Sequence, residues 1–426
     1  MSKIKIAVIG AGQRGNIYAE HIANSEEAEI VAVVEPFFER REAMKSKYQI
    51  REEMAFDNID DFYNKGKICD AVIISTMDRL HFDMTMKALE LGYDILLEKP
   101  ISPVAEECVL IEDKAKAKGN KLVIAHVLRY APIYSKLKEI IESGEIGKVI
   151  SIQHNENIGN FHMAHSFVRG NWKNKNETSP IILQKSSHDF DILTWLVNSK
   201  SRKIASFGEL TYFKKENAPY GSGEKCLECP VADKCRYDAK KVYLPIKGEW
   251  PATAVTEDQT EEGILKALKS GPYGQCVYKC DNNVCDHQAT IIEFENGVTA
   301  TFNLSAFTNK IKRTFKIMCE DGEIRGDDSK NELQIIKFSS NQDEPEKCVI
   351  INPKNVEGFH GGGDFGLIKD FISVLSENTQ NSKTSIEKSI ESHLMAFAAE
   401  ESRVSNKMII MNEYRNKILE SAIRRY

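Results

Sequence analysis

Residues 4–15, which read Ile-Lys-Ile-Ala-Val-Ile-Gly-Ala-Gly-Gln-Arg-Gly, decide the fold. Residues 4–9, which are apolar apart from Lys5, predict a short buried strand, and a helix is expected to begin directly after the glycine loop. In such a loop the first glycine permits a tight turn, the second lets the main chain approach a pyrophosphate, and the third lets helix and strand pack closely. The residues that we expect to cradle phosphates are Gly10, Gly12, Gln13, Arg14 and Gly15. A glycine turn that binds no ligand is the alternative interpretation.

Glu35 stands at the end of the next predicted strand, twenty residues after Gly15. A carboxylate at that point accepts hydrogen bonds from both ribose hydroxyls and repels a 2′-phosphate. The sequence therefore favours NAD over NADP as the cofactor. Arg40 and Arg41 follow closely and could instead hold a phosphate, which keeps NADP as the alternative.

Short β-branched runs alternate with helical patterns through the first part of the chain. The expected strands cover residues 4–9, 30–34, 71–75, 95–98 and 122–126. Such alternation is typical of a doubly wound parallel sheet. We therefore predict an α/β domain that binds the dinucleotide over residues 1–130.

After Gly147 the pattern changes to longer alternating strands, which are typical of an open, mainly antiparallel sheet. The strands and helices expected here cover residues 149–154, 289–304, 181–197, 365–375 and 385–404. Residues 217–286 form an insertion rich in cysteine, glycine and charge. The second domain is thus predicted to be α+β over residues 131–426.

Composition excludes several classes of protein. The chain has 57 Lys and Arg against 63 Asp and Glu, a net charge of −6, which argues against a globally basic nucleic-acid binder. No run of apolar residues is long enough for a membrane span or for the core of a signal peptide. We expect a cytoplasmic protein with reduced thiols.

Glu98-Lys99-Pro100 ends a predicted buried strand at its carboxyl edge, where doubly wound sheets bind their ligands. The Lys99 ammonium would lie beside the nicotinamide and stabilise an alkoxide that develops on the substrate. A simple turn is the alternative. The cofactor residues that we add to the glycine loop and Glu35 are Ser75, Thr76, His81, Glu98 and Lys99.

The predicted helix 181–197 carries polar side chains on one face and leucines on the other. The polar residues are Gln184, Lys185, His188 and Asp191. His188 has an ordinary pKa near 6.5, which suits a general base at neutral pH. A histidine with a purely structural role is the alternative.

The glycine loop, Glu98-Lys99-Pro100 and residues 126–132, His-Val-Leu-Arg-Tyr-Ala-Pro, resemble the Gfo/Idh/MocA family of oxidoreductases. The resemblance implies a Rossmann domain followed by a substrate domain whose open sheet forms a dimer or tetramer contact. It also implies a cis Lys99–Pro100 bond. The implied activity is NAD(P)-dependent oxidation or reduction of a sugar, cyclitol or related polyol.

The family carries Asp-x-x-x-His-x-x-Asp on the helix of the second domain, and His188 with Asp191 matches its latter part. Gln184 stands where the family has its first aspartate, and glutamine cannot relay a proton. Lys185 either reaches the substrate as a second cation or is solvated. We therefore assign catalysis to Lys99, His188 and Lys185.

A polar and aromatic loop follows the first strand of the second sheet, and three glycines between His360 and Asp364 precede a late helix. Polyol sites need dense hydrogen-bonding groups and an aromatic platform. The expected substrate residues are Arg129, His165, Arg169, Asn171, Trp172, Gln184, Asp191 and His360. A flexible connection is the alternative interpretation of the glycines.

Six of the ten cysteines fall between Cys226 and Cys285. Three cysteines near the start of this stretch, together with one of two cysteines about 40 residues further on, would give the four thiolate ligands of a closed, structural zinc site. The expected ligands are Cys226, Cys229, Cys235 and Cys280, with Cys276 as the alternative fourth. Iron–sulfur ligation and unligated thiols are the other interpretations.

The sequence predicts an NAD-dependent dehydrogenase that acts on a secondary hydroxyl of a sugar, cyclitol or sugar derivative. One alternative is net glycoside hydrolysis or lysis, in which oxidation is transient and is followed by elimination. A second alternative is a sensor or assembly protein that binds NAD without turnover. A homodimer or homotetramer is expected, with no nucleic-acid or membrane partner.

Overall fold

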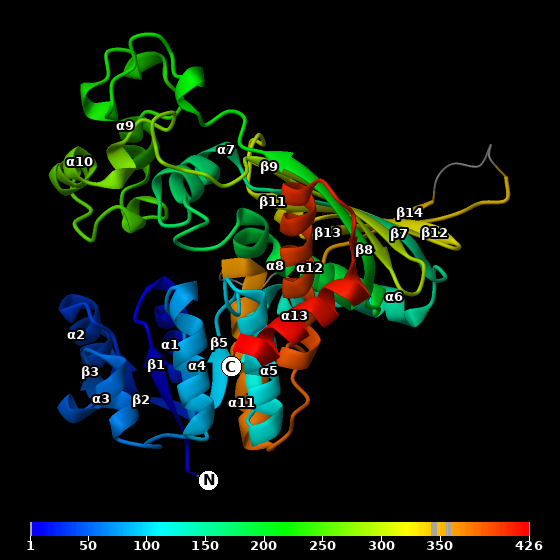
Figure 1. Cartoon of the computed structure of the whole chain (residues 1–426), viewed down its shortest axis with the longest axis horizontal. Helices are drawn as coiled ribbons and strands as arrows, with labels where there is room; N and C mark the ends of the chain where they lie inside the picture. The colour runs from blue at the N-terminus through cyan, green and yellow to red at the C-terminus, as the bar shows by residue number, and fades with distance from the viewer. Residues whose placement is uncertain (1, 342–346, 355, 357–358, 426) are drawn as a thin grey trace.

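The computed structural model describes residues 2–341, 347–354, 356 and 359–425, and two sheets organise this part of the chain (Figure 1). The first is a six-stranded parallel sheet in the order β3-β2-β1-β4-β5-β6. Its strands are β1 (Ile4–Ile9), β2 (Ala28–Val34), β3 (Ala55–Phe56), β4 (Ala71–Ile74), β5 (Asp94–Leu97) and β6 (Leu122–Ile124). This confirms the prediction of a doubly wound α/β sheet. Strand β3 is not predicted from the sequence, because its two residues are too few to form a hydrophobic run.

Helices follow these strands in the right-handed crossover pattern of a doubly wound sheet. They are α1 (Gln13–Ala23), α2 (Phe38–Lys47), α3 (Ile59–Asn64), α4 (His81–Glu90), α5 (Ala105–Lys118) and α6 (Pro132–Ser143). The four residues of β4 are all buried, as a strand covered on both faces requires. Strand order reverses between β1 and β4, and the loops after both strands meet there, which is where such sheets bind ligands.

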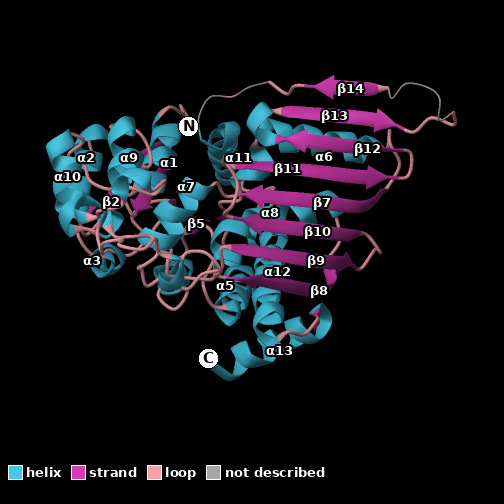
Figure 2. Cartoon of the chain, turned by 90° about the horizontal axis from the view of Figure 1, so that it is seen from above, coloured by secondary structure: helices cyan, strands magenta, loops and turns pink. Residues whose placement is uncertain are grey.

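The second sheet has nine strands in the order β14-β13-β12-β11-β7-β10-β9-β8-β15 (Figure 2). Strands β7 and β10 pair in parallel, and the other neighbours pair antiparallel. The strands are β7 (Val149–Asn157), β8 (Ser201–Glu209), β9 (His287–Phe294), β10 (Thr299–Ser305), β11 (Lys312–Cys319), β12 (Gly322–Asp327), β13 (Glu332–Lys337), β14 (Cys348–Ile351) and β15 (Ile409–Ile410). The expected strand 289–304 is in fact the hairpin of β9 and β10, because Asn296-Gly297 turns the chain, with Gly297 at φ 88°.

Helices cover one face of this sheet, and Figure 2 shows its strands in front of α6, α8 and α12. The remaining helices are α7 (Asn160–His162), α8 (Ile181–Val197), α9 (Ala239–Tyr243), α10 (Glu261–Ser270), α11 (Gly363–Ser376), α12 (Ile386–Ser405) and α13 (Met411–Arg425). Helix α11 returns to the first sheet, where Leu367 and Phe371 share a core with Ile6 and Val8. The second half of the chain therefore completes the packing of the first.

The insertion leaves the sheet after β8 and returns at β9. Its short helices α9 and α10 enclose a small core of their own, formed by Ala239, Tyr243, Ile264 and Leu268. Figure 1 shows this part of the chain, with α9 and α10, above the strands and helices of the first sheet. Among the described residues, no helix combines the length and apolar character needed to cross a membrane.

Candidate active site

The glycine loop has the geometry that a bound pyrophosphate requires. Gly10 adopts φ 94°, and a Cβ there would lie 2.8 Å from the carbonyl oxygen of Ser75. A Cβ on Gly15 would lie 2.0 Å from the carbonyl oxygen of Gly10, so only glycine lets helix α1 pack this closely. A Cβ on Gly12 would meet nothing within 4 Å, which leaves open space over the start of the helix. This cradle fits a dinucleotide.

The Glu35 carboxylate is fixed at the end of β2 beside the glycine loop. It accepts hydrogen bonds from the main-chain amides of Ala11, at 2.8 Å, and Phe37, at 3.1 Å. Arg41 donates to the main-chain carbonyl of Glu35 and not to its carboxylate. The carboxylate is thus held at the position from which an acidic residue contacts a ribose.

Lys99 follows the carboxyl end of β5, and its bond to Pro100 is cis, as the family resemblance implies. The Lys99 ammonium donates a 2.8 Å hydrogen bond to the main-chain carbonyl of Gln184 on α8. Burial, together with the nearby cations Lys185 and Arg14 and despite Glu98, lowers the pKa of Lys99 to about 8. This amine can change its charge close to neutral pH.

Helix α8 begins directly after Pro180, and Arg79 from the first sheet holds the segment that leads into it. The Arg79 guanidinium donates to the main-chain carbonyls of Asn176, Glu177 and Thr178. Three hydrogen bonds from one side chain orient α8 toward the edge of the first sheet. The helix thereby presents its polar face to Lys99.

A cavity of about 230 Å³ lies between the loops of the first sheet and α8, and we call it the cleft. It brings together most of the predicted cofactor and catalytic residues. The predicted residues that line it are Arg14, Ser75, Thr76, His81, Glu98, Lys99, Trp172, Gln184, Lys185, His188 and His360. Burial and then the Lys99 charge lower the pKa of His188 well below its ordinary value, so its imidazole is neutral.

A charged network closes one side of the cleft. Arg14 donates to the carboxylates of Glu98, at 2.7 Å, and Asp364, which in turn contacts His360 Nδ1 at 3.1 Å. His360 and Arg14 outweigh the effect of burial and hold the pKa of Asp364 at about 2. His360 itself adopts φ 53°, in the left-handed region of backbone conformation that few non-glycine residues occupy.

Lys185 lines the cleft but also contacts a buried carboxylate behind it. Its Nζ lies 3.4 Å from Oε1 of Glu156, which in turn pairs with Arg313 at 2.5 Å. Burial raises the pKa of Glu156 although both cations oppose the shift. Lys185 is therefore anchored rather than freely solvated.

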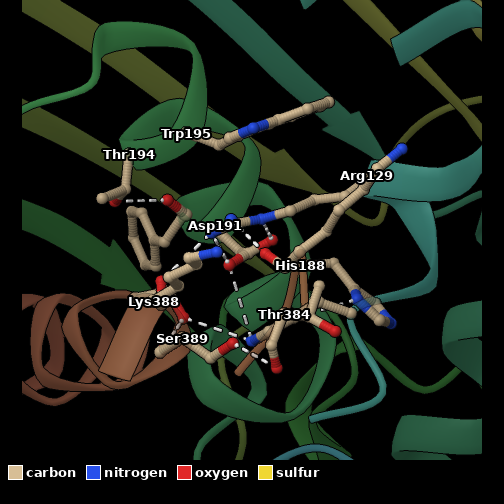
Figure 3. Close-up of polar contacts among 12 residues, drawn as sticks. Arg129, His188, Asp191, Thr194, Trp195, Thr384, Lys388 and Ser389 are labelled. Carbon is tan, nitrogen blue, oxygen red and sulfur yellow. Dashed lines mark hydrogen bonds and ion pairs between the residues drawn. The ribbon is translucent and has the colours of Figure 1, made fainter. Parts of the chain in front are cut away.

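Arg129 and Asp191 lie outside the lining of the cleft, although both were expected to bind substrate. They form a bidentate buried pair, with Arg129 Nε 2.7 Å and Nη2 2.6 Å from the two carboxylate oxygens of Asp191. Figure 3 shows the Arg129 side chain alongside Trp195 as it reaches Asp191. This pair holds α8 to the loop that follows β6.

His165 and Arg169 also lie outside the cleft lining, buried against the insertion. The His165 ring stacks on Tyr273 at 4.7 Å and contacts the Tyr243 hydroxyl at 2.9 Å. Arg169 donates to the main-chain carbonyls of Gln275 and Tyr237 and to Cys226 Sγ. These two residues fasten the insertion to the domain.

The zinc prediction is not supported. Cys226, Cys229, Cys235 and Cys276 border one narrow cavity, but within the described ranges no group of three or more His, Cys, Asp or Glu side chains could hold a metal ion. Burial raises the pKa of Cys226 and Cys276, and that of Cys280 to about 11. Cys280 Sγ points to the main-chain carbonyl of Cys276, at 3.3 Å.

Besides Asp78 and Ala125, three neighbouring cleft residues were not predicted: His162, Ser166 and Phe167. They lie on α7 and on a π-helical stretch, Met163–Arg169, which follows it. A π-helix changes the angular period of side chains, so the spacing of an α-helix does not predict which of them face the cleft. The two histidines at positions 162 and 165 were the sequence signal for site residues in this stretch. In the structure, the side chain of His162 lines the cleft.

Two family descriptions match the chain. Residues 4–126 match the NAD-binding Rossmann fold of the oxidoreductase family, and residues 138–410 match its C-terminal alpha/beta domain. The Bacillus subtilis (strain 168) protein YteT, which is named as an oxidoreductase, is 25% identical over 75% of this chain and 76% of its own length. Inositol 2-dehydrogenase of Corynebacterium glutamicum (strain R) is 29% identical over 47% of this chain. The matched part covers 56% of that relative's own length.

Solved structures share the fold. A levoglucosan dehydrogenase, in complex with NADH and L-sorbose, has a TM-score of 0.71 at 17% identity and covers 96% of this chain and 99% of its own. The glycine cradle, the lysine at the end of β5 and the helix opposite it agree with the two family matches, which together extend over both sheets. The chain belongs to the Gfo/Idh/MocA family of oxidoreductases.

Proposed function

We propose that the chain is an NAD-dependent dehydrogenase that acts on a secondary hydroxyl of a sugar, cyclitol or sugar derivative. The observation that carries the proposal is that Lys99, in the loop after β5, and His188, on α8, line one cleft beside the glycine loop. A cation and a neutral imidazole that face the same space supply what alcohol oxidation needs.

NAD is proposed over NADP because of Glu35. Its carboxylate is buried and bonded to the loop amides, so it would lie next to a bound ribose, where it would repel a 2′-phosphate. Gly10, Gly12 and Gly15 would hold the pyrophosphate, and Ser75 and Thr76 would border the cofactor at the edge of the cleft. When bound, NAD would accept a hydride from the substrate.

The protein side chains would perform the proton chemistry. His188 would take the proton of the substrate hydroxyl, while Lys99 would donate a hydrogen bond to the same oxygen and stabilise its negative charge. The carbinol C–H bond breaks as the carbonyl forms, so the substrate loses one proton to His188 and one hydride to the cofactor. Lys185, which lines the same cleft, is proposed to add positive charge.

The cleft contains buried polar atoms that favour a polyol. Gln184 Oε1, His162 Nδ1 and Asp78 Oδ1 have no hydrogen-bond partner within the described part of the chain. Buried polar atoms need partners, and a substrate with several hydroxyls could satisfy them. Trp172 borders the same space and offers an aromatic surface. The names of the relatives, inositol and levoglucosan dehydrogenases, support this substrate class.

Several sequence-based expectations stay predictions. These are the division into domains at residue 130, the homodimer or homotetramer and the cytoplasmic location. The two alternative functions become outcomes of a single experiment, in which the purified chain is incubated with NAD and a panel of sugars, cyclitols and glycosides while NADH absorbance and product mass are recorded.

A polyol that yields NADH and a product two mass units lighter would support the dehydrogenase. Release of an aglycone that needs NAD but accumulates no NADH would instead favour the glycoside-cleaving alternative. Tight NAD binding without turnover of any panel member would overturn both and favour the sensor.

A further inference from the structure

Three buried histidines form a row of neighbouring rings between the main-chain amide of Ile101, which follows Pro100, and the cleft. His393 lies on α12, His126 follows β6, and His188 lies on α8. The ring centres of His393 and His126 are 5.4 Å apart, and those of His126 and His188 are 5.6 Å apart. Only His188 borders the cleft.

The tautomer of His393 is fixed by the main chain. The amide of Ile101, which follows Pro100, donates a 3.0 Å hydrogen bond to His393 Nε2. An amide can only donate, so this nitrogen carries a lone pair and the proton of the neutral ring is on Nδ1. Nδ1 accordingly lies 3.2 Å from the main-chain carbonyl of Ser389, which accepts it.

Ser392 helps to determine which ring nitrogen of His126 bears the proton. Its hydroxyl donates to the same Ser389 carbonyl at 2.7 Å, which leaves an oxygen lone pair free to accept from His126 Nε2 at 3.4 Å. The Asp191 carboxylate lies 3.8 Å from the same Nε2 and favours a proton on it, because an anion attracts an N–H and repels a lone pair. His126 is therefore protonated on Nε2 and bears its lone pair on Nδ1.

The contact between His126 and His188 determines the tautomer of His188. His126 Nδ1 and His188 Nδ1 are 3.5 Å apart, and since the first carries the lone pair the second must carry the proton. The lone pair of His188 is then on Nε2, the nitrogen that a general base needs to present to a substrate hydroxyl.

We propose that His126 is a positioning residue that holds His188 in the Nδ1–H tautomer, so that Nε2 is ready to accept the substrate proton. The inference rests on His188 being the base of the proposed dehydrogenase. All three rings are neutral in this arrangement: burial first, and then neighbouring cations or rings, lower the pKa of His126 and His188 well below the ordinary value and that of His393 to about 3.

The test measures the tautomer directly. The full-length protein is labelled with ¹⁵N-histidine, and long-range ¹H–¹⁵N correlations are recorded without substrate at pH 7.5, with the His188 signals assigned by their loss in His188→Gln. We expect wild-type His188 to be protonated on Nδ1. A His188 ring protonated mainly on Nε2 would overturn the inference even if polyols are oxidised.

Two variants separate positioning from packing. His126→Asn keeps an acceptor oxygen near the place of Nδ1, and we expect the His188 tautomer to be retained and kcat to stay within about threefold of wild type. His126→Phe keeps a ring without the acceptor, so we expect mixed tautomers and a kcat about 10- to 100-fold lower, less than the roughly 100- to 10,000-fold that a general base contributes in full. His287→Asn, at a side chain 45% exposed, is the control.

An unchanged His188 tautomer in His126→Phe would contradict the inference. If that variant does not fold, the wild-type spectrum and His126→Asn decide the matter. Because the spectra need no substrate, the expected tautomer in a protein that oxidises no polyol would leave the positioning intact and reject only the proposed function.

Discussion

The Lys99 ammonium donates its 2.8 Å hydrogen bond to the main-chain carbonyl of Gln184, and this contact joins the end of β5 to the helix that carries His188. A main-chain acceptor is present whatever side chain occupies position 184. The position of Lys99 is therefore insensitive to the presence of glutamine where the family carries aspartate. What changes is the capacity for proton relay at that position, because the glutamine amide does not ionise.

Replacing Lys99 tests its proposed role on the substrate oxygen. We expect Lys99→Ala to lower kcat for polyol oxidation by about 100- to 1,000-fold, the usual effect of losing one group that stabilises a developing oxyanion. NAD affinity, measured by fluorescence titration, should stay within about threefold. Lys116→Ala, at a side chain 50% exposed on α5, is the control and should behave as wild type. Equal turnover by Lys99→Ala and wild type would remove the lysine from the mechanism.

The pH dependence follows from the two groups. Since the pKa of Lys99 is lowered to about 8, the ammonium is lost as pH rises through that value, and kcat/KM for oxidation should fall above about pH 8. Because the pKa of His188 lies well below 6.5, the base stays neutral and no acid limb is expected near pH 6.5. Measurement of kcat/KM from pH 5.5 to 9.5 would show the fall above about pH 8 and the absence of an acid limb near pH 6.5. Lys99→Arg, which keeps its charge, should move the alkaline limb upward; an unmoved limb would assign it to another group.

Glu35 is expected to select the cofactor. Glu35→Ser removes the carboxylate that would bond the ribose and repel a 2′-phosphate, so NAD affinity should fall and the ratio of NADP to NAD affinity should rise by about tenfold or more. Isothermal titration with each dinucleotide measures the ratio. Glu39→Ser, on the first turn of α2, is a matched control. A ratio unchanged in Glu35→Ser would place the selectivity elsewhere.

The Arg129–Asp191 pair is expected to stabilise the protein without touching substrate. Asp191→Ala leaves the buried guanidinium unpaired, which typically costs about 3–5 kcal/mol. The apparent melting temperature should drop by several degrees, while KM of the folded fraction stays near the wild-type value. Glu112→Ala, which removes the i,i+4 partner of the exposed Lys116, should shift the melting temperature by less than a degree or two. A large rise in KM with an unchanged melting temperature would instead assign Asp191 to substrate binding.

Much of the fold could be predicted because local pattern and topology agree. The buried β-branched runs of the first sheet and the amphipathic helix over residues 181–197 are strong periodic signals, and the structure has α8 at Ile181–Val197. The strand expected at 289–304 failed at Asn296-Gly297, whose turn geometry interrupts an otherwise continuous alternation. Strand β3 has two residues and no period to detect.

The site was predictable where a residue's position follows from a strand end or a helix face, as for Lys99 and His188. It was not predictable where a partner distant in the sequence decides the orientation. Asp191 shares the helix with His188, yet Arg129 captures its carboxylate. Likewise His165 was expected in the cleft, but the insertion supplies the rings that bury it, and no local pattern reveals such a partner.

The central claim is that Lys99 and His188 act on one carbinol beside the cofactor. The most direct measurement is deuterium transfer from a carbon-deuterated polyol, identified in the substrate panel, to NAD in wild type, Lys99→Ala and His188→Gln, followed by mass spectrometry of the reduced cofactor. We expect deuterated NADH from wild type and transfer at least about 100-fold slower in both variants. Transfer at the wild-type rate in either variant, or NADH without deuterium, would contradict it.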